Sequence, residues 1–365
     1  MSEYNNFELK NDNRDSEPDY YAMYVQEKNK EAGRVFSRYH LSLFLFIVIS
    51  YAVIIFSQIA LILFLGKDRY TDLMENIYVT WIFNIVSMYL IAFPIFVLLV
   101  KNMKTEKREK TKMGAGEFLS LLLIGEFLMF AGNLIGQFIN NVISKLSGNE
   151  ISNSLDELID KSPVWILFAV TVIIGPIIEE LMFRKLMIDR LSRYGDLLAI
   201  IVSSIGFGLF HGNFYQFFYA AMLGFILGYI YSKTRNIKYS ILMHMIINFM
   251  GSVAVLPLLD ILEEFTEMSN VLIEGGKIDY QAFVQNLFVI ASYSVIQYTL
   301  YIAGAAILVI YISRKLFKFE KKCEYSLPKE KRVGTVLLNV GTILFLVSSI
   351  AVFAVNILSE VLTKQ

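Results

Sequence analysis

The chain has 365 residues, of which 56% are hydrophobic and 14% aromatic. This composition is too apolar for an ordinary soluble domain and indicates a membrane protein. The 33 basic residues (Lys and Arg) equal the 33 acidic residues in number, so the net charge predicts no nucleic-acid partner. Cys323 is the only cysteine, which excludes an intrachain disulfide and a metal site built from several thiolates.

The first 40 residues are polar and mixed in charge. They lack the apolar core of a cleavable signal peptide. We therefore expect a polar cytoplasmic arm at 1–40, flexible over 1–35, with membrane insertion beginning at the first internal apolar run.

Nine later segments are apolar runs that approach or exceed the roughly 20 residues needed to cross a bilayer. They are 41–66, 77–100, 117–143, 163–185, 196–211, 214–232, 239–257, 287–313 and 333–358. Because the fifth and sixth runs are short, the sequence predicts eight or nine transmembrane helices. The expected fold class is an all-α polytopic membrane protein.

The loops between these runs alternate in charge. Basic residues gather in 28–38, 101–112, 185–193, 233–238 and 314–332. Acidic residues gather in the intervening 156–160 and 263–279. Because basic loops tend to stay in the cytoplasm, we expect an integral membrane protein whose N-terminus is cytoplasmic.

Ionisable side chains occur inside three of the apolar runs. Glu179 and Glu180, with Arg184 close behind, lie in the fourth run, His211 ends the fifth, and His244 lies in the seventh. Ionisable groups at membrane depth are energetically costly, so each is a candidate functional residue. Acids and imidazoles on separate apolar helices suggest proton-transfer chemistry inside the bilayer.

The two adjacent glutamates are expected to have different roles, because successive helical residues point about 100° apart. Glu180 and Arg184 are four residues apart and share a face, which suits an intrahelical ion pair. Glu179 is then directed elsewhere and can face a cavity. Pro176 is expected to bend the helix and open space beside the carboxylates. The alternative is that these charges mark the end of the span, where they return to water.

Both histidines have partners at helical spacing. Phe207 precedes His211 by four residues, so the ring and the imidazole share a helix face. Asn248 follows His244 by four residues, which places two hydrogen-bond donors on one face. A single intramembrane histidine more often makes a packing hydrogen bond. Two of them together with an unpaired glutamate favour catalysis.

Three motifs follow one another on the fourth, fifth and seventh runs: EELMFR at 179–184, FGLFH at 207–211 and HMIIN at 244–248. In this order they resemble the EExxxR, FxxxH and HxxxN signatures of the CPBP family of intramembrane proteases. That family includes the type II CAAX prenyl endopeptidases and many bacterial proteins of the Abi group. The resemblance makes a bacterial cell membrane the expected location.

The resemblance covers about 163–257 and so suggests a division of the chain into five parts. These are the polar arm 1–40, accessory transmembrane helices at 41–145, the catalytic core 163–257, an acidic extracytoplasmic loop at 258–286 and C-terminal transmembrane helices at 287–358.

The resemblance implies an intramembrane endopeptidase that acts on a membrane-associated protein or peptide within the lipid bilayer. It implies that Glu179 and His211 activate a water molecule and that His244 and Asn248 form an oxyanion hole. Glu180, Arg184 and Phe207 are then supporting residues. Fixed donors stabilise the negative charge that develops on a carbonyl oxygen during amide hydrolysis, so the implied roles are chemically consistent.

Alternatives to a metal-free peptidase are also open. One glutamate and two histidines could hold Zn²⁺ with a position left for water, although the HExxH motif is absent, so we expect no metal and no cofactor. A catalytically silent scaffold or regulator of a signalling or immunity system is a second alternative, but every expected catalytic position is filled. A proton-coupled transporter is a third, and the lack of inverted halves counts against it.

The third apolar run carries a polar stripe. Glu126, Asn133, Gln137 and Asn140 fall on one helix face. A polar face avoids lipid, so we expect the stripe to line a water path or substrate groove. A helix that lies in the membrane interface is the alternative.

The sixth run carries a ridge of small residues, Ala220, Gly224 and Gly228, which is expected to pack closely against another core helix.

The fifth run raises a difficulty, because hydropathy places its last residue, His211, near the membrane face opposite to Glu179. A shared water molecule would require 196–211 to begin below the membrane plane or to tilt.

Overall fold

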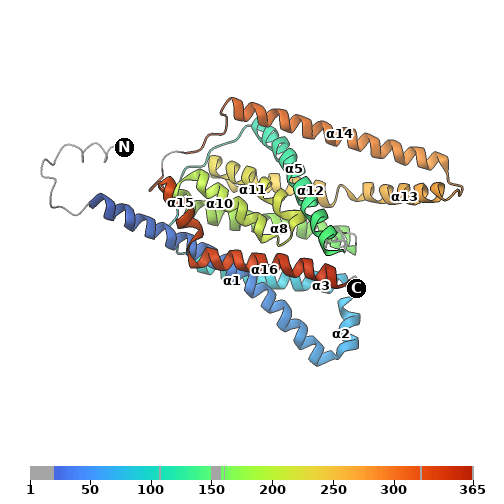
Figure 1. The fold of residues 1–365 in the computed structure, drawn as a ribbon, viewed down its shortest axis with the longest axis horizontal. Coiled ribbons are helices and arrows are strands. Elements are labelled where there is room, and N and C mark those ends of the chain that lie inside the picture. Colours follow the sequence, from blue (N-terminus) through green and yellow to red (C-terminus); the bar gives the residue numbers. More distant parts are fainter. Residues whose placement is uncertain (1–19, 107, 149–157, 160, 321–322, 364–365) are drawn as a thin grey trace.

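The structure is a computed structural model that describes all residues except 1–19, 107, 149–157, 160, 321–322 and 364–365 (Figure 1). Every regular element in the described residues is helical. In chain order the elements are α1 (Tyr20–Leu65), α2 (Lys67–Met74), α3 (Ile77–Asn84), η1 (Ile85–Ala92), α4 (Phe93–Val100), α5 (Ala115–Ser147), α7 (Val164–Ile166), η2 (Leu167–Ile174), α8 (Gly175–Glu180), η3 (Leu181–Ile188), α9 (Asp189–Leu191), η4 (Ser192–Tyr194), α10 (Asp196–Phe210), α11 (Phe214–Thr234), α12 (Ile237–Ser252), α13 (Leu256–Ile273), α14 (Tyr280–Ser313), α15 (Lys329–Leu337) and α16 (Val340–Thr363). Elements η1, η2 and η3 are π-helical, whereas η4 is a 3₁₀ turn.

Eight helical stretches in the described part of the chain are long and apolar enough to cross a membrane. They are Ala22–Leu65, Ile77–Val100, Ala115–Ser147, Val164–Tyr194, Phe214–Thr234, Ile237–Ile273, Tyr280–Ser313 and Val340–Ser359. A ninth apolar helix, α10, has 15 residues. The predicted all-α polytopic class is confirmed, and each of the nine predicted runs overlaps one of these helices, although the last run, 333–358, starts within α15 and is interrupted before α16.

The polar arm expected at 1–40 is helical wherever the structure describes it. Residues 1–19 lie outside the described residues, but 20–40 form the first half of α1, which continues without a break to Leu65. The prediction of a flexible arm at 1–35 is therefore wrong for 20–35. This half of α1 is partly buried, and Ala32, Phe36 and Tyr39 are fully enclosed by the bundle.

The acidic loop expected at 258–286 is also mostly helical. It contains most of α13 and the beginning of α14, and these two helices lie side by side (Figure 1). Phe265 of α13 stacks on Phe283 of α14 with 4.8 Å between ring centroids. Asn286 donates a hydrogen bond of 3.1 Å to Glu264. The sequence analysis missed α13, because its acidic residues interrupt the apolar positions on which a hydropathy count depends.

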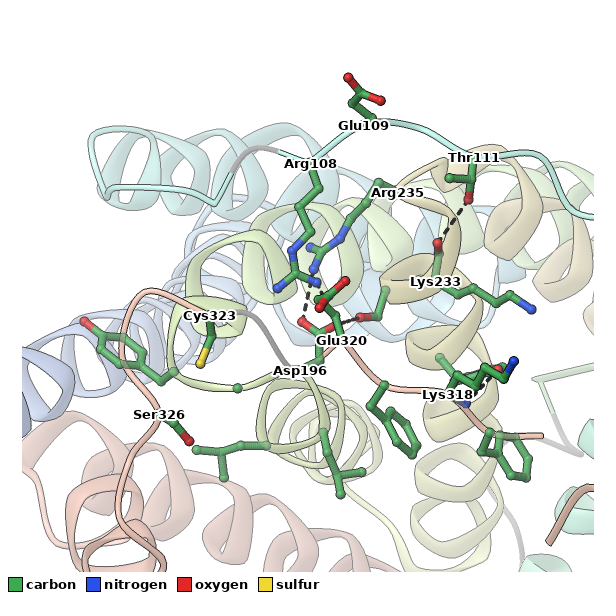
Figure 2. A pocket seen from close by; sticks show the side chains of 18 of the residues that line it. Arg108, Glu109, Thr111, Asp196, Lys233, Arg235, Lys318, Glu320, Cys323 and Ser326 are labelled. Carbon is green, nitrogen blue, oxygen red and sulfur yellow. Dashed lines mark hydrogen bonds and ion pairs between the residues drawn. The ribbon is translucent and has the colours of Figure 1, made fainter. Parts of the chain in front are cut away.

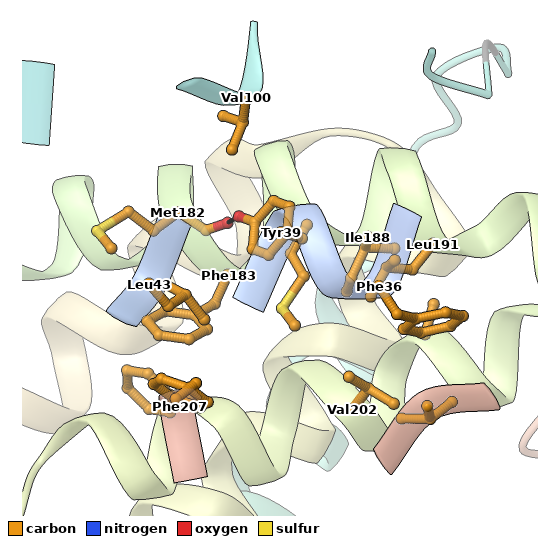
Figure 3. Packing of buried hydrophobic residues seen from close by; sticks show 14 of the residues in the cluster. Phe36, Tyr39, Leu43, Val100, Met182, Phe183, Ile188, Leu191, Val202 and Phe207 are labelled. Carbon is orange, nitrogen blue, oxygen red and sulfur yellow. Dashed lines mark hydrogen bonds between the residues drawn. The ribbon is translucent and has the colours of Figure 1, made fainter. Parts of the chain in front are cut away.

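The centre of the bundle is built around the helices that carry the three motifs. Helix α11 packs against both α5 and α10, and α1 runs along α16 (Figure 1). Figure 3 shows Tyr39 and Leu43 of α1 packed near Met182 and Phe183 of η3. The Tyr39 hydroxyl donates a buried hydrogen bond of 2.6 Å to the Met182 carbonyl oxygen. Helix α1, which the family resemblance does not include, therefore braces the helix that carries Glu179.

Charged side chains at one end of the bundle are buried and paired. Arg235, just after α11, lies 3.3 Å from Asp189 and 3.2 Å from Asp196. Arg108 lies 2.7 Å from Asp196, and the Tyr231 hydroxyl donates 2.6 Å to Asp189. These contacts explain why the fourth apolar helix continues past its predicted end at 185. The charges of this helix are paired with side chains of neighbouring elements, so they do not need to be solvated by water.

The ridge of small residues on α11 packs against α10, as the sequence predicts. A Cβ atom on Gly224 would lie 3.1 Å from the Ser204 Cα atom and 3.2 Å from the Phe207 ring. A Cβ atom on Gly228 would lie 3.2 Å from Ile200. Because Phe207 belongs to one of the three motifs, this contact fixes a site residue as well as the helix spacing.

We expect Gly224→Leu to destabilise the protein by about 1–3 kcal/mol, because overpacking forces helices apart. Thermal unfolding of the purified protein in detergent measures this as a lower midpoint. Gly116→Leu in α5 is the matched control, since a Cβ atom there has no neighbour within 4 Å. Equal midpoints for the two variants would contradict the packing argument.

Candidate active site

The fourth apolar helix changes its hydrogen-bond pattern twice around the adjacent glutamates. The short α-helical segment α8 lies between the π-helical segments η2 and η3. Gly175 donates its backbone N–H to the Val170 carbonyl, five residues back, and Pro176 follows with no N–H to donate. Short π-helical segments are rare and frequently occur at functional sites. The helix thus changes its hydrogen-bond register at Pro176, and the bend expected there stays a prediction.

The two glutamates point into different surroundings, as predicted from their helical spacing. Glu180 is fully buried and its Oε2 atom lies 3.4 Å from Arg184 Nε, which is also fully buried. The Glu179 side chain is 22% exposed. The ion pair expected between Glu180 and Arg184 is present, and Glu179 is the carboxylate that a small molecule can reach.

His244 of α12 lies between the two carboxylates. Its Nδ1 atom is 3.1 Å from Glu180 Oε1, and its Nε2 atom is 3.6 Å from Glu179 Oε2. The imidazole is 3% exposed. One histidine therefore links the buried carboxylate to the accessible one, a connection that no local sequence spacing predicts.

His211 is held in one tautomer by a hydrogen bond along its own helix. Its Nδ1 atom lies 2.8 Å from the Phe207 carbonyl oxygen. A carbonyl oxygen only accepts, so Nδ1 must carry the proton. In the neutral imidazole, Nε2 then has a free lone pair and can accept a proton or a hydrogen bond from water.

The Phe207 ring is the common contact of the site. It lies edge-on to His211 at 4.8 Å and to His244 at 5.7 Å between ring centroids, with interplanar angles of 88° and 89°. The Arg184 guanidinium carbon is 4.5 Å from the same ring centre, a cation–π distance. Phe207 itself is 1% exposed. The structure thus gathers Arg184, His211 and His244 around one apolar ring, and the two glutamates lie next to His244.

The depth of His211 differs from the expectation drawn from hydropathy. The helix of Glu179 extends to Tyr194, and α10 begins almost immediately afterwards at Asp196. Glu179 lies 15 residues before Tyr194, and His211 lies 15 residues after Asp196. At about 1.5 Å per residue the two side chains therefore stand at similar heights in an antiparallel pair. Hydropathy separated the two residues because it ended the fourth run at 185, nine residues too early, and the structure instead has the arrangement that a shared water molecule requires, with α10 starting beyond that end.

Asn248 lies one turn beyond His244, and part of its hydrogen-bonding capacity is used within the bundle. Its Nδ2 atom donates 2.9 Å to the Thr171 carbonyl oxygen in η2. The Thr171 hydroxyl in turn lies 3.1 Å from the Ser252 hydroxyl. A carboxamide has two N–H donors, so one N–H of Asn248 is left for another acceptor.

Tyr89 is a site residue that the sequence analysis missed. A Cβ atom on Gly175 would lie 3.5 Å from the Tyr89 hydroxyl oxygen and 4.0 Å from Glu179 Oε1, so both oxygens lie over this glycine. Tyr89 belongs to the π-helical η1, which is followed by Pro94 in α4. A π-helical segment followed by proline therefore occurs on both helices at this point. The only sequence signal was a tyrosine close before a proline in an apolar run.

The polar stripe on α5 does not share one environment. Glu126 and Asn133 are half-buried, Gln137 is exposed, and Asn140 is buried with no partner for its Nδ2 atom among the described residues. Between these polar positions α5 lies close to α11, and a Cβ atom on Gly132 would be 2.6 Å from the Tyr219 backbone. A water path along the stripe stays a prediction.

The arrangement of acids and histidines also bears on a metal site. Across the residues that the structure describes, no three His, Cys, Asp or Glu side chains are grouped in a way that could hold a metal ion. Glu180 in particular is already committed to Arg184 and His244.

The part of the chain that carries the three motifs is similar to a known protein family. Residues 161–250 match the family model described as type II CAAX prenyl endopeptidase Rce1-like. All three motifs lie inside this segment, so the resemblance drawn from them is confirmed. Residues 161–250 are therefore similar to the Rce1-like CAAX protease family, and the match does not extend to the rest of the chain.

Two bacterial proteins are similar over longer stretches. The chain is 26% identical over 243 residues to YdiL, a candidate membrane peptidase of Bacillus subtilis (strain 168), covering 63% of this chain and 96% of YdiL. It is 28% identical over 197 residues to the membrane-embedded CAAX protease MroQ of Staphylococcus aureus (strain USA300), covering 50% of this chain and 77% of MroQ. No solved structure matches the chain significantly.

We expect Glu180→Gln to cost about 3–5 kcal/mol of stability, because it leaves the buried Arg184 without its counter-charge. Glu179→Gln, the matched control one residue away, should change stability by less than about 1 kcal/mol, as is usual for a partly exposed side chain. Thermal unfolding in detergent and the yield of folded protein measure both variants. The assignment would be reversed if Glu179→Gln were the unstable protein.

Proposed function

We propose that this protein is an intramembrane endopeptidase that hydrolyses a peptide bond of a membrane-associated protein or peptide. The observation that supports this most directly is the geometry of one accessible carboxylate, Glu179, linked through His244 to a buried carboxylate. His211, with its Nε2 lone pair free, contacts the same aromatic ring as His244. The match of residues 161–250 to the Rce1-like family supports the same activity.

In the proposed reaction Glu179 and His211 together bind and activate one water molecule. The water oxygen forms a bond to the carbonyl carbon of the substrate, and Glu179 accepts a proton from the water at the same time. His211 Nε2 orients the water by accepting its second hydrogen bond. When the tetrahedral intermediate collapses, the C–N bond breaks and the proton held by Glu179 passes to the leaving nitrogen.

The negative charge on the carbonyl oxygen requires donors that are fixed before the reaction begins. We assign the free N–H of Asn248 to this role, since its other N–H is anchored on Thr171. We assign His244 as the second donor of the oxyanion hole: Nδ1–H stays on Glu180, and a proton on Nε2, whose 3.6 Å contact with Glu179 is longer than a hydrogen bond, would be donated to the carbonyl oxygen. Glu180, Arg184 and Phe207 act through His244 and are positioning residues.

The proposed partners are a membrane-associated protein or peptide and the lipid bilayer, with no role for nucleic acid. MroQ is named a CAAX protease and the family a prenyl endopeptidase family, so a prenylated substrate is one member of the proposed class. The polar residues of the site recognise a peptide bond and do not by themselves select a lipid modification. We place the protein in a bacterial cell membrane with its N-terminus in the cytoplasm.

Glu179→Gln should lower peptide-bond hydrolysis by about 10²–10⁴-fold, because the amide cannot accept the proton of water. His211→Ala should have a similar effect. Membrane peptidomes of cells that produce wild-type or variant protein at equal levels measure the cleavage products. Glu263→Gln, on the exposed part of α13, is the control and should match the wild type. Unchanged products with Glu179→Gln would exclude the proposed chemistry.

We further expect hydrolysis to proceed without a metal ion. Cleavage by the purified protein should persist in 1,10-phenanthroline, and elemental analysis should find zinc well below one equivalent per chain. The physical reason is that Glu179 and His211 provide two groups that take protons directly. Loss of activity with the chelator, followed by recovery on adding Zn²⁺, would establish the zinc alternative instead.

A further inference from the structure

A large cavity lies at the end of the bundle where charged residues gather, away from the candidate active site. Its volume is about 1360 Å³, and it is lined by the loop before α5, the start of α10, the end of α11 and the segment that follows α14 (Figure 2). Glu179 and His211 are each about 22 Å from this end by helix length. The cavity lies where α11 and α14 end, and both are helices long and apolar enough to cross a membrane.

The lining of this cavity is basic. It includes six cationic side chains, Arg108, Lys233, Arg235, Lys315, Lys318 and Arg332, against three acidic ones, Glu109, Asp196 and Glu320. Asp196 is already bound by Arg108 and Arg235. Lys315 and Lys318 are exposed and form no ion pair with any residue that the structure describes. An anion that entered would find positive charge that the protein has not neutralised.

Two buried donors on the cavity lining have no acceptor in the described chain. Arg235 is 5% exposed and its Nε atom has no hydrogen-bond partner. The Tyr194 side chain is 2% exposed and its hydroxyl has none either. Buried polar groups are nearly always hydrogen-bonded. Both donors therefore call for a ligand that accepts hydrogen bonds.

The wall formed by the segment after α14 is held firmly in place. Glu324 lies 2.7 Å from Arg193 Nε and 2.9 Å from Lys104 Nζ. The backbone N–H of Tyr325 donates 2.9 Å to the Arg193 carbonyl oxygen. The Arg193 guanidinium lowers the pKa of the Glu324 carboxyl to about 2, so this anchor stays charged at physiological pH.

The same cavity has an apolar side that continues down the bundle. Leu197 lines the cavity and is 41% exposed, and Ile201 and Ile205 follow at 40% and 48%. These residues are spaced four apart, so they form one exposed stripe along α10. A ligand that fits both features has an acidic head and a hydrocarbon tail.

We propose that this cavity binds an anionic phospholipid, with its phosphate at the basic lining and an acyl chain along the α10 stripe. Phosphate oxygens accept hydrogen bonds from guanidinium and hydroxyl donors, and basic pockets between membrane helices suit anionic headgroups. The site is separate from the candidate active site, so the proposal does not depend on peptidase activity.

The test uses the full-length protein, purified in detergent and titrated with phosphatidylglycerol or phosphatidylcholine of the same acyl chains. Native mass spectrometry counts bound lipid, and thermal unfolding reports stabilisation. Phosphatidylglycerol should bind at least tenfold more tightly than phosphatidylcholine. Lys315→Gln/Lys318→Gln should weaken phosphatidylglycerol binding by about fivefold per lysine removed.

Lys67→Gln/Lys277→Gln is the matched control, since both lysines are exposed and neither lines the cavity. It should bind phosphatidylglycerol as the wild type does. Equal binding of the two lipids, or an equal loss in both double variants, would overturn the proposal. Inorganic phosphate or glycerophosphoglycerol, which have no acyl chains, should not stabilise the protein at the lipid concentrations used. Full stabilisation by either would mean that the cavity serves a soluble phosphate and would overturn the assignment to lipid.

Discussion

The site depends on keeping one complete ion pair inside an apolar bundle. Arg184 is fully buried, and its counter-charge is Glu180. The nitrogen atoms of this arginine have no hydrogen-bond partner among the described residues, so the Phe207 ring and the nearby carboxylate supply its stabilisation. A buried charge is tolerated only when such compensation exists. Phe207 and His244 contact this ion pair directly, and His211 packs on Phe207.

Helices outside the Rce1-like segment complete this environment. Tyr89 reaches Gly175 and Glu179 from η1, and Tyr39 of α1 holds the backbone of η3. Neither residue lies in 161–250. The accessory helices thus close the site with tyrosine hydroxyls, which provide a polar tip on an otherwise apolar ring. In this protein the segment 161–250 therefore relies on neighbouring helices for part of the polar shell of the candidate site.

Sequence reasoning worked where the information is local. The apolar runs gave the helices, and spacing along one helix gave the Glu180–Arg184 pair and the separate direction of Glu179. It failed where contacts between helices decide the outcome. Hydropathy ended the fourth run at 185, because it counts Asp189 and Arg190 as exposed charges although both are buried. His244 lies between two carboxylates, and Tyr89 lies beside Glu179, because of tertiary packing. The spacing of residues along one helix does not predict either position.

The π-helical segments on either side of α8 make the number of residues in this helix as important as their identity. Each residue advances an α-helix by about 100°, so one residue fewer between 167 and 174 would rotate everything that follows relative to what precedes it. Glu179 and Glu180 would then point in different directions, although neither side chain had changed. The candidate site therefore depends on the helical phase as well as on residue identity. Deleting one residue of η2 would disrupt the site while all three motifs stayed intact.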